Sequence, residues 1–320
     1  MINNTYAPIV IFVYRRVDKT KNLISLLSKN HLASESEVFI FSDGSKGEKD
    51  KKSVNEVRDY IDSIESDRSF KRVIVKKADC NHGLAESIIT GITEVISKYK
   101  KVIVLEDDLI LSDTFLEYMN ECLEFYKDDK RIWSISGYTP DLFSLESYDK
   151  NVYLCYKSFS WGWGTWKDRW DLVDWDVKDY NSFRFNLMER TKLSRGGDDL
   201  LGMLRDQMKG RLDSWAIRWG YSQMKHDGMT IAPRYAYSVN DGLDGSGTHS
   251  VEADVKQYKN ELKSSSKVNW CYDDLEPDKK IISEYKKLFH ESIFRRLRIE
   301  GGAVKRRIKE KFGIYKKVRA

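Results

Sequence analysis

Short apolar runs alternate with amphipathic segments over the first hundred residues, and this alternation constrains the fold more than any other feature. The first run is nearly continuous in Val, Ile and Phe, which is typical of a strand covered on both faces of a parallel sheet. The runs span residues 8–14, 37–43, 72–78 and 101–108. The segments between them, such as 83–99, carry apolar residues at helical spacing. The pattern predicts an α/β fold with a Rossmann-like, doubly wound and mostly parallel sheet.

Polar residues follow each of these runs directly. The clusters are Tyr14-Arg15-Arg16, Asp43-Gly44-Ser45, Asn81-His82 and Glu106-Asp107-Asp108. The carboxyl ends of parallel strands meet at one edge of a sheet, and open α/β sheets bind their ligands there. We therefore expect these clusters to form a ligand site.

The acidic cluster at 106–108 is the most informative of the four. Carboxylate oxygens are the ligands that Mg²⁺ and Mn²⁺ prefer. Because neighbouring residues on a strand point to opposite faces, we expect one direct metal ligand, with the other acids placing a nucleotide or ordering waters. The alternative is an exposed acidic turn, with Asp113 capping the next helix.

The glycine-rich phosphate loops of other nucleotide-binding folds are absent from the sequence. No G-x-x-x-x-G-K-[ST] motif is present, which argues against a P-loop NTPase. No G-x-G-x-x-G motif follows the first run, which argues against a dinucleotide-binding enzyme. A nucleotide diphosphate held by a metal ion, without a glycine cradle, is the remaining interpretation.

Seven segments occur in the order seen in bacterial GT-A glycosyltransferases, and they are also similar to the N-acetylglucosaminyltransferase I family. They are PIVIFVYRR, FIFSDGS, NHGLAESI, VIVLEDD, SFSWGWGTWKDRW, LDSWAIRW and GTHS. The resemblance covers roughly residues 6–250. It implies a GT-A catalytic domain over 1–250, with a nucleotide-sugar-binding half (1–113) and an acceptor-binding half (114–250). Residues 251–320 would form a helical extension.

The resemblance implies a metal-dependent, inverting transferase that uses nucleotide sugars, and it assigns roles to single residues. Asp108 matches the metal-ligating acid, Asp107 a contact to the ribose or to a metal-bound water, and Glu106 a contact near the donor sugar. Asp43 resembles the acid that reads a uracil-type base, and Arg16 resembles an arginine that contacts the nucleotide. UDP-N-acetylglucosamine is the implied donor.

Two further positions follow from the same resemblance. Asn81 falls near a histidine of the family and is carried over as a nucleotide-sugar contact, with His82 beside it. His249, in the GTHS segment, matches a histidine that reaches the metal or the diphosphate; a merely exposed loop histidine is the alternative.

An inverting transferase needs a base that removes the proton of the acceptor hydroxyl. We predict that Asp213, two residues before Trp215, is this base. Asp199, or Asp198 beside it, is the alternative. An Asp ahead of an apolar helical run also serves as a helix cap, so a capping role for Asp213 stays open.

Residues 158–175 are rich in Trp and Gly. Aromatic faces pack on the apolar faces of sugars, and glycines let a ligand approach the backbone closely. We predict that Trp161 and Trp163 line the pocket for donor and acceptor, with burial in the core as the alternative. Trp166 and Trp170, four residues apart, are expected to pack a helix against the core.

The basic charge is concentrated at the carboxyl end of the chain. Residues 293–320 carry 11 Lys and Arg against two Glu. The net charge of this segment therefore exceeds the net charge of the whole sequence, which is +5. Apolar residues recur among them at helical spacing, which is typical of a helix on an anionic membrane surface. They are Val304, Ile308, Phe312 and Tyr315. An oligomer contact or a solvated helix remains open, and no motif accompanies the tail that would read a nucleic acid.

Together these features predict a cytoplasmic enzyme, held peripherally at the inner face of the cytoplasmic membrane. It would extend a glycan acceptor, such as a lipid-linked oligosaccharide, in bacterial surface polysaccharide synthesis. The 4 cysteines are widely spaced and are expected to be buried free thiols. A catalytically inactive sugar- or nucleotide-binding protein of the same fold is the competing hypothesis.

Overall fold

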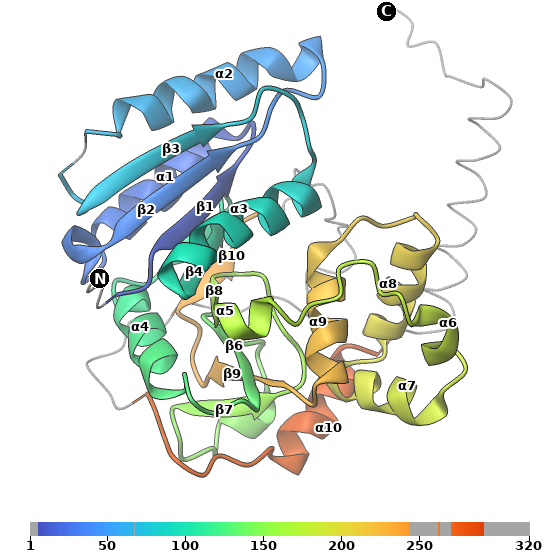
Figure 1. Ribbon diagram of the computed structural model, residues 1–320. Coiled ribbons are helices and arrows are strands. Elements are labelled where there is room, and N and C mark those ends of the chain that lie inside the picture. The colour runs from blue at the N-terminus through green and yellow to red at the C-terminus, as the bar shows by residue number, and fades with distance from the viewer. Residues whose placement is uncertain (1–5, 67, 243–261, 263–269, 291–320) are drawn as a thin grey trace, which may run out of the picture.

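The computed structural model describes residues 6–66, 68–242, 262 and 270–290. Within these residues, eight strands form one mixed sheet in the order β3-β2-β1-β4-β8-β6-β9-β7 (Figure 1). The strands are β1 (Ile9–Val13), β2 (Glu37–Ser42), β3 (Arg72–Lys77), β4 (Lys101–Glu106), β6 (Ile132–Ser136), β7 (Val152–Cys155), β8 (Trp163–Trp166) and β9 (Met229–Pro233). Six of them run in one direction, and β7 and β8 oppose them. The predicted α/β fold with a mostly parallel sheet is confirmed.

The order of the strands reverses between β1 and β4. The chain passes outward from β1 to β2 and β3, and then returns to place β4 on the other side of β1. Both neighbours are parallel to β1, with Ile9 opposite Val38 on one side and opposite Ile103 on the other. The carboxyl ends of β1 and β4 therefore border the crevice in which a doubly wound sheet binds its ligand.

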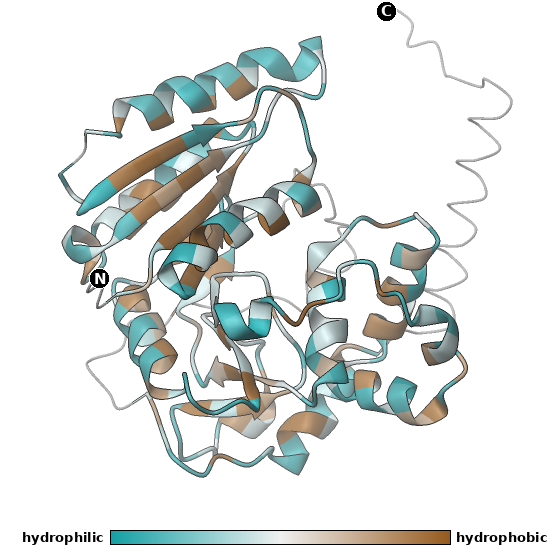
Figure 2. Ribbon diagram, in the orientation of Figure 1, coloured by the Kyte–Doolittle hydropathy of each residue, from teal (hydrophilic) through white to brown (hydrophobic). Residues whose placement is uncertain are grey.

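Helices cover both faces of the sheet. On one face lie α1 (Val17–Ser28), α2 (Glu48–Ser63) and α4 (Phe115–Phe125); on the other lie α3 (Leu84–Tyr99), α5 (Lys167–Trp170) and α9 (Trp215–Lys225). In β1, Ile9 and Ile11 pack toward the first group, and Val10 and Phe12 toward the second. This alternation explains why the β1 sequence is apolar throughout (Figure 2).

A small two-stranded sheet follows β4. It pairs β5 (Leu109–Leu111) with β10 (Ser238–Asn240) in antiparallel register, and Asn240 lies opposite Leu109. Residues more than a hundred positions apart in sequence thus meet directly after the acidic end of β4.

The remaining helices form a lobe beside the sheet. Here α6 (Tyr180–Phe183), α7 (Leu187–Leu193) and α8 (Asp199–Met208) pack with α9 around Phe183, Leu204 and Tyr221. The helix α10 (Lys279–Leu288) covers the β7 region through Ile281 and Tyr285. Short 3₁₀ turns occur at η1 (Ala33–Glu35), η2 (Phe143–Leu145) and η3 (Ser194–Gly196).

The predicted halves, 1–113 and 114–250, both contribute strands to the one eight-stranded sheet. Of the predicted extension 251–320, α10 is the described helix, and the basic tail lies outside the described residues. In the part of the chain that is described, no helix combines the length and the apolar character needed to cross a bilayer. Three cysteines are buried as expected, but the expectation is wrong for Cys80, which is exposed on the loop before α3.

Five tryptophans join the helical lobe to the sheet. Trp163 of β8 stacks on Trp215 with ring centroids 5.0 Å apart and also contacts Trp219 at 5.4 Å. Trp133 and Trp170 extend the cluster on either side. The expectation that Trp170 packs a helix against the core is therefore confirmed. Large buried aromatic surfaces of this kind contribute strongly to stability.

Replacing Trp163 with alanine should lower the free energy of unfolding by about 3–5 kcal/mol, because it removes a buried ring and leaves a cavity. Phe143, which is 78 % exposed, offers a matched control, and Phe143→Ala should change stability by no more than about 0.5 kcal/mol. Denaturant unfolding of the two variants measures the difference. A Trp163→Ala protein as stable as the control would contradict the core role.

Candidate functional site

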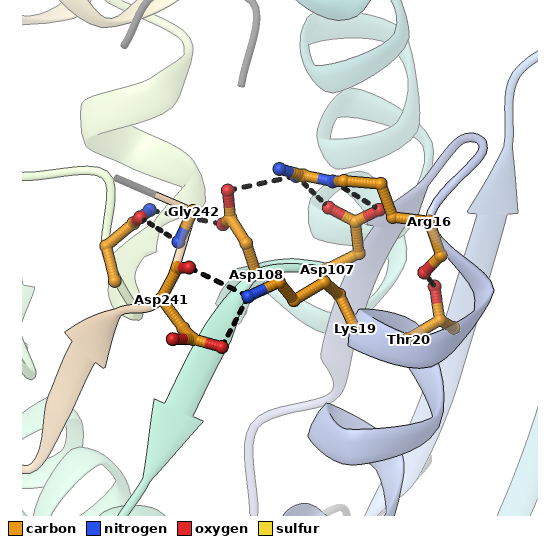
Figure 3. A network of polar contacts seen from close by, with 8 residues as sticks. Arg16, Lys19, Thr20, Asp107, Asp108, Asp241 and Gly242 are labelled. Atoms are coloured by element: carbon orange, nitrogen blue, oxygen red, sulfur yellow. Dashed lines mark hydrogen bonds and ion pairs between the residues drawn. The ribbon is translucent and has the colours of Figure 1, made fainter. Parts of the chain in front are cut away.

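Arg16 contacts two carboxylates beyond the carboxyl ends of β1 and β4 (Figure 3). Its Nη2 donates hydrogen bonds to Asp108 Oδ2 at 2.9 Å and to Asp107 Oδ1, and its Nε donates to Asp107 Oδ2 at 3.4 Å. Asp107 and Asp108 are only 5 % and 8 % exposed. The structure thus brings together the clusters that follow the first and fourth predicted strands.

The turn after β10 closes over the other side of Asp108. Asn240 Nδ2 donates to Asp108 Oδ1 at 3.1 Å, and the backbone N–H of Asp241 donates to the carbonyl of Asp108 at 2.8 Å. Lys19 of α1 holds this turn through the backbone carbonyl of Asp241, at 2.8 Å. A Cβ at Gly242 would lie 2.2 Å from Asp108 Oδ2, so a larger residue there would displace the Asp108 side chain.

These contacts were not all visible in the sequence. Lys19, Asp241 and Gly242 could not be found from local patterns, because their role depends on the pairing of β5 with β10. The polar, glycine-containing stretch that begins at Asn240 was the one available signal.

Two acids of this cluster, Glu106 and Asp107, have raised pKa values. Burial raises the pKa of Glu106 to about 8, and the charges of Asp108 and Asp107 add to the effect. Burial also raises the pKa of Asp107 to about 6, although the Arg16 guanidinium opposes it. The Arg16 guanidinium therefore does not offset the burial of these two acids, and added positive charge would favour their ionised forms.

The chemistry of this cluster fits a divalent cation shared with a phosphate ligand. Mg²⁺ and similar ions are commonly held by one or two carboxylates, together with waters and phosphate oxygens. Asp107 and Asp108 supply such oxygens in a buried, hydrogen-bonded arrangement. Among the described residues no group of three His, Cys, Asp or Glu side chains forms a cage for a metal. The protein would thus supply part of the coordination and the ligand the rest.

One nitrogen of Arg16 is available for an anion. Nη1 is buried and has no hydrogen-bond partner among the described residues. A buried guanidinium N–H without an acceptor is costly, and a phosphate oxygen is a suitable acceptor for it. The same side chain therefore touches both acids and offers a donor to a ligand.

The carboxylate of Asp43, which the resemblance assigns to reading a base, is hydrogen-bonded within the protein. Its carboxylate accepts hydrogen bonds from the backbone N–H groups of Gly44 at 2.8 Å and of His82 and Gly83 at 2.9 Å. It also accepts one from Asn81 Nδ2 at 2.9 Å. A carboxylate has about four acceptor sites, so the protein itself occupies them. Asp43 and Asn81 thus join the loop after β2 to the loop before α3, and their contacts to a nucleotide sugar stay a prediction.

The two tryptophans predicted to line the pocket have different environments. The prediction is wrong for Trp163, which is 1 % exposed and packed among other tryptophans. Trp161 is partly buried, and its carbonyl accepts a hydrogen bond from Ser238 Oγ at 2.6 Å. Because Ser238 begins β10, Trp161 is tied to the strand that ends beside Asp108. Trp166, which was expected to pack against the core, is buried. Its Nε1 donates a hydrogen bond to the carbonyl of Leu123 at 2.9 Å.

Asp213 precedes α9 with its side chain 71 % exposed. It accepts a hydrogen bond from Arg218 Nη2 at 3.0 Å. The capping interpretation is wrong, because the N-cap is Ser214, whose Oγ accepts from the N–H of Ile217 at 3.4 Å. The carboxylate of Asp213 is therefore accessible to an acceptor, and its role as a base stays a prediction.

The alternative bases are each paired with another side chain. Asp199 accepts two hydrogen bonds from Lys157 Nζ, at 2.8 and 3.0 Å, and the pair is largely buried. Breaking a buried pair typically costs about 3–5 kcal/mol, which disfavours Asp199 as a base. Asp198 pairs with His290 Nδ1 at 3.0 Å. His249, predicted as a metal contact, lies outside the described residues.

Comparisons with known proteins give a likeness of backbone architecture. No family model matches the chain. No curated protein matches it. Among solved structures, S. aureus TarS is 12% identical at a TM-score of 0.31, with 41% of this chain and 21% of that chain covered. The structure of TarS 1-349 is 12% identical at a TM-score of 0.42, with 73% and 59% covered.

The mannosyltransferase PcManGT from Pyrobaculum calidifontis, in complex with GDP-Man and Mn²⁺, is 10% identical at a TM-score of 0.40, with 70% of each chain covered. Of the first TarS structure named above, this chain covers only about a fifth of the length. The comparisons do not show the N-acetylglucosaminyltransferase I family, and that resemblance stays a prediction.

The raised pKa of Glu106 predicts a pH dependence of stability in the metal-free protein. The folded state holds this proton up to about pH 8, whereas the unfolded carboxyl loses it near its ordinary pKa of 4.5. Stability should therefore fall as pH rises from about 5 to 8, because ionisation is less favourable in the folded state. In Glu106→Gln the fall should be smaller by roughly 2–4 kcal/mol.

Unfolding in the presence of a chelator at several pH values measures this effect. The control is Glu48→Gln, because the Glu48 side chain is 88 % exposed. The control should keep the wild-type profile. Parallel pH profiles for wild type and Glu106→Gln would contradict the raised pKa of Glu106 in the folded state.

Proposed function

We propose that this chain is a glycosyltransferase that moves a sugar from a nucleotide-sugar donor to a hydroxyl group of a glycan acceptor. The observation that carries the proposal is the buried group of Arg16, Asp107 and Asp108 at the crevice between β1 and β4. It combines oxygens suited to a divalent cation with a guanidinium suited to a phosphate. This combination suits a nucleotide diphosphate that is bound without a glycine-rich loop.

The cation, Mn²⁺ or Mg²⁺, would be held by Asp108, with Asp107 beside it. When bound, such an ion supplies positive charge that stabilises the departing diphosphate. Arg16 would bind a phosphate oxygen through Nη1, the nitrogen without a partner among the described residues. Asn240 would keep the Asp108 carboxylate in its orientation. Glu106, close to the same acids, would contact the donor sugar.

Asp213 would remove the proton from the acceptor hydroxyl. Its side chain is exposed, and Arg218 orients it without burying it. One base is enough for a single displacement, because the leaving diphosphate is stabilised by charge and needs no acid. A single displacement inverts the configuration at the sugar carbon. Trp161 would contribute an aromatic surface near the donor.

We further propose UDP-N-acetylglucosamine as the donor and a lipid-linked glycan of bacterial surface polysaccharide as the acceptor. The support is the sequence resemblance for the donor and the basic, amphipathic pattern of 293–320 for the lipid surface. On this proposal the enzyme works in the cytoplasm, at the inner face of the membrane.

Nucleotide binding tests the donor site most simply. Thermal unfolding with UDP, GDP, CMP or dTDP, each with and without Mn²⁺, should show stabilisation by one nucleotide only when the metal is present, since binding to the folded state raises its stability. Asp108→Asn should abolish this shift, whereas the exposed control Asp59→Ala should retain it. The absence of any response in wild type would count against the proposed function.

Transfer activity tests the base. Asp213→Asn should lower kcat by about 10²–10⁴-fold, because general-base catalysis typically contributes this much. The same variant should keep the metal-dependent nucleotide shift. Asp199→Asn should mainly lower stability, since it leaves Lys157 buried and unpaired. Nucleotide binding without any transfer in wild type would favour the inactive binding protein, and near-normal turnover in Asp213→Asn would move the base elsewhere.

A further inference from the structure

The connection between α6 and α7, together with the first turn of α7, exposes three large apolar side chains within four residues. Phe185, Leu187 and Met188 are 74%, 76% and 77% exposed. Other exposed apolar residues, such as Phe143 and Leu172, stand apart from one another in the sequence. Single exposed apolar residues are ordinary, but a group of them marks a contact surface. We call these three residues the apolar edge.

The apolar edge does not belong to the core of the lobe. Its neighbours Phe183 and Leu193 point inward and pack with α8 and α9. Asn186 caps α7, and its side chain accepts hydrogen bonds from the N–H groups of Met188 and Glu189. This cap orders the turn that carries Leu187 and Met188, so their exposure is built into the local structure. Figure 1 places α6 and α7 at the border of the molecule, away from β1.

Two arginines accompany the apolar edge. The Arg184 guanidinium lies over the ring of Phe185, 4.5 Å from its centroid. Arg190 Nη1 donates to the carbonyl of Arg184 at 2.9 Å. Among the described residues neither arginine forms an ion pair. The acid in this segment, Glu189, is already paired with Lys225 at 2.6 Å.

We infer that the apolar edge is a contact site for an anionic lipid bilayer, with Phe185, Leu187 and Met188 entering the interface and Arg184 and Arg190 meeting lipid phosphates. Apolar side chains beside basic groups that lack an acidic partner are the pattern of interfacial membrane segments. This site is separate from the basic tail, and stable membrane binding commonly takes two signals. The inference does not depend on the reaction that the protein catalyses.

A second copy of the chain fits this surface less well. A two-fold contact would place the arginines of one copy beside those of the other, where like charges repel. A specific protein interface also typically uses about 20–30 residues on each side, far more than the apolar edge offers. A bilayer needs neither a large area nor a complementary shape.

Vesicle flotation of the full chain tests the inference, with phosphatidylcholine vesicles that contain or lack phosphatidylglycerol. The variant Phe185→Ser/Leu187→Ser/Met188→Ser should bind anionic vesicles at least tenfold more weakly than wild type. Phe143→Ser, which changes an equally exposed ring elsewhere, should bind as wild type does. Arg184→Gln/Arg190→Gln should weaken binding to the anionic vesicles alone. Unchanged binding by the triple serine variant would overturn the inference.

A local probe separates the apolar edge from the basic tail. Leu187→Cys, in a Cys80→Ser background, would carry an environment-sensitive fluorophore, since the other three cysteines are buried. Its emission should shift to the blue on anionic vesicles, whereas a label at Phe143→Cys should not respond. No shift at residue 187 on vesicles that carry the protein would overturn the inference. Self-association that the triple variant abolishes, without any vesicle response, would assign the surface to a second copy instead.

Discussion

The contact of one guanidinium with two buried carboxylates is the interaction on which the site depends. Buried acids of like charge repel one another and lose hydration, so they persist only with a partner. Arg16 is that partner for Asp107 and Asp108. It can reach them because β1 and β4 are neighbours at the point where the sheet reverses its order. The arrangement of the strands thus creates the charge cluster.

A second constraint comes from β10, which is far from β4 in the sequence. The pairing of β10 with β5 carries Asn240 to Asp108 and packs Gly242 against the Asp108 side chain. Both oxygens of the Asp108 carboxylate therefore have donors, one from each side of the crevice. These contacts fix the orientation of the Asp108 carboxylate, and a fixed orientation is what an electrostatic site requires.

The local sequence was enough to predict β1–β4, the helices between them and the meeting of the Arg16 cluster with the acids, because each follows from periodicity and chain order. It was not enough for Trp163, since a tryptophan near glycines suits a sugar pocket and a packed core equally well. Ser214 and Asp213 are both good caps, and only backbone geometry decides between them. The hydrogen bonding of Asp43 depends on a distant loop, as does the pairing of Asp199 with Lys157.

The most direct test of the account is anomalous diffraction at the manganese edge, from crystals grown with Mn²⁺ and UDP. The account predicts one strong peak in contact with the Asp108 carboxylate and with the diphosphate, and an Arg16 side chain that touches a phosphate oxygen. Bound nucleotide with the peak elsewhere, or with Asp108 still closed on Arg16 and no metal beside it, would contradict the account.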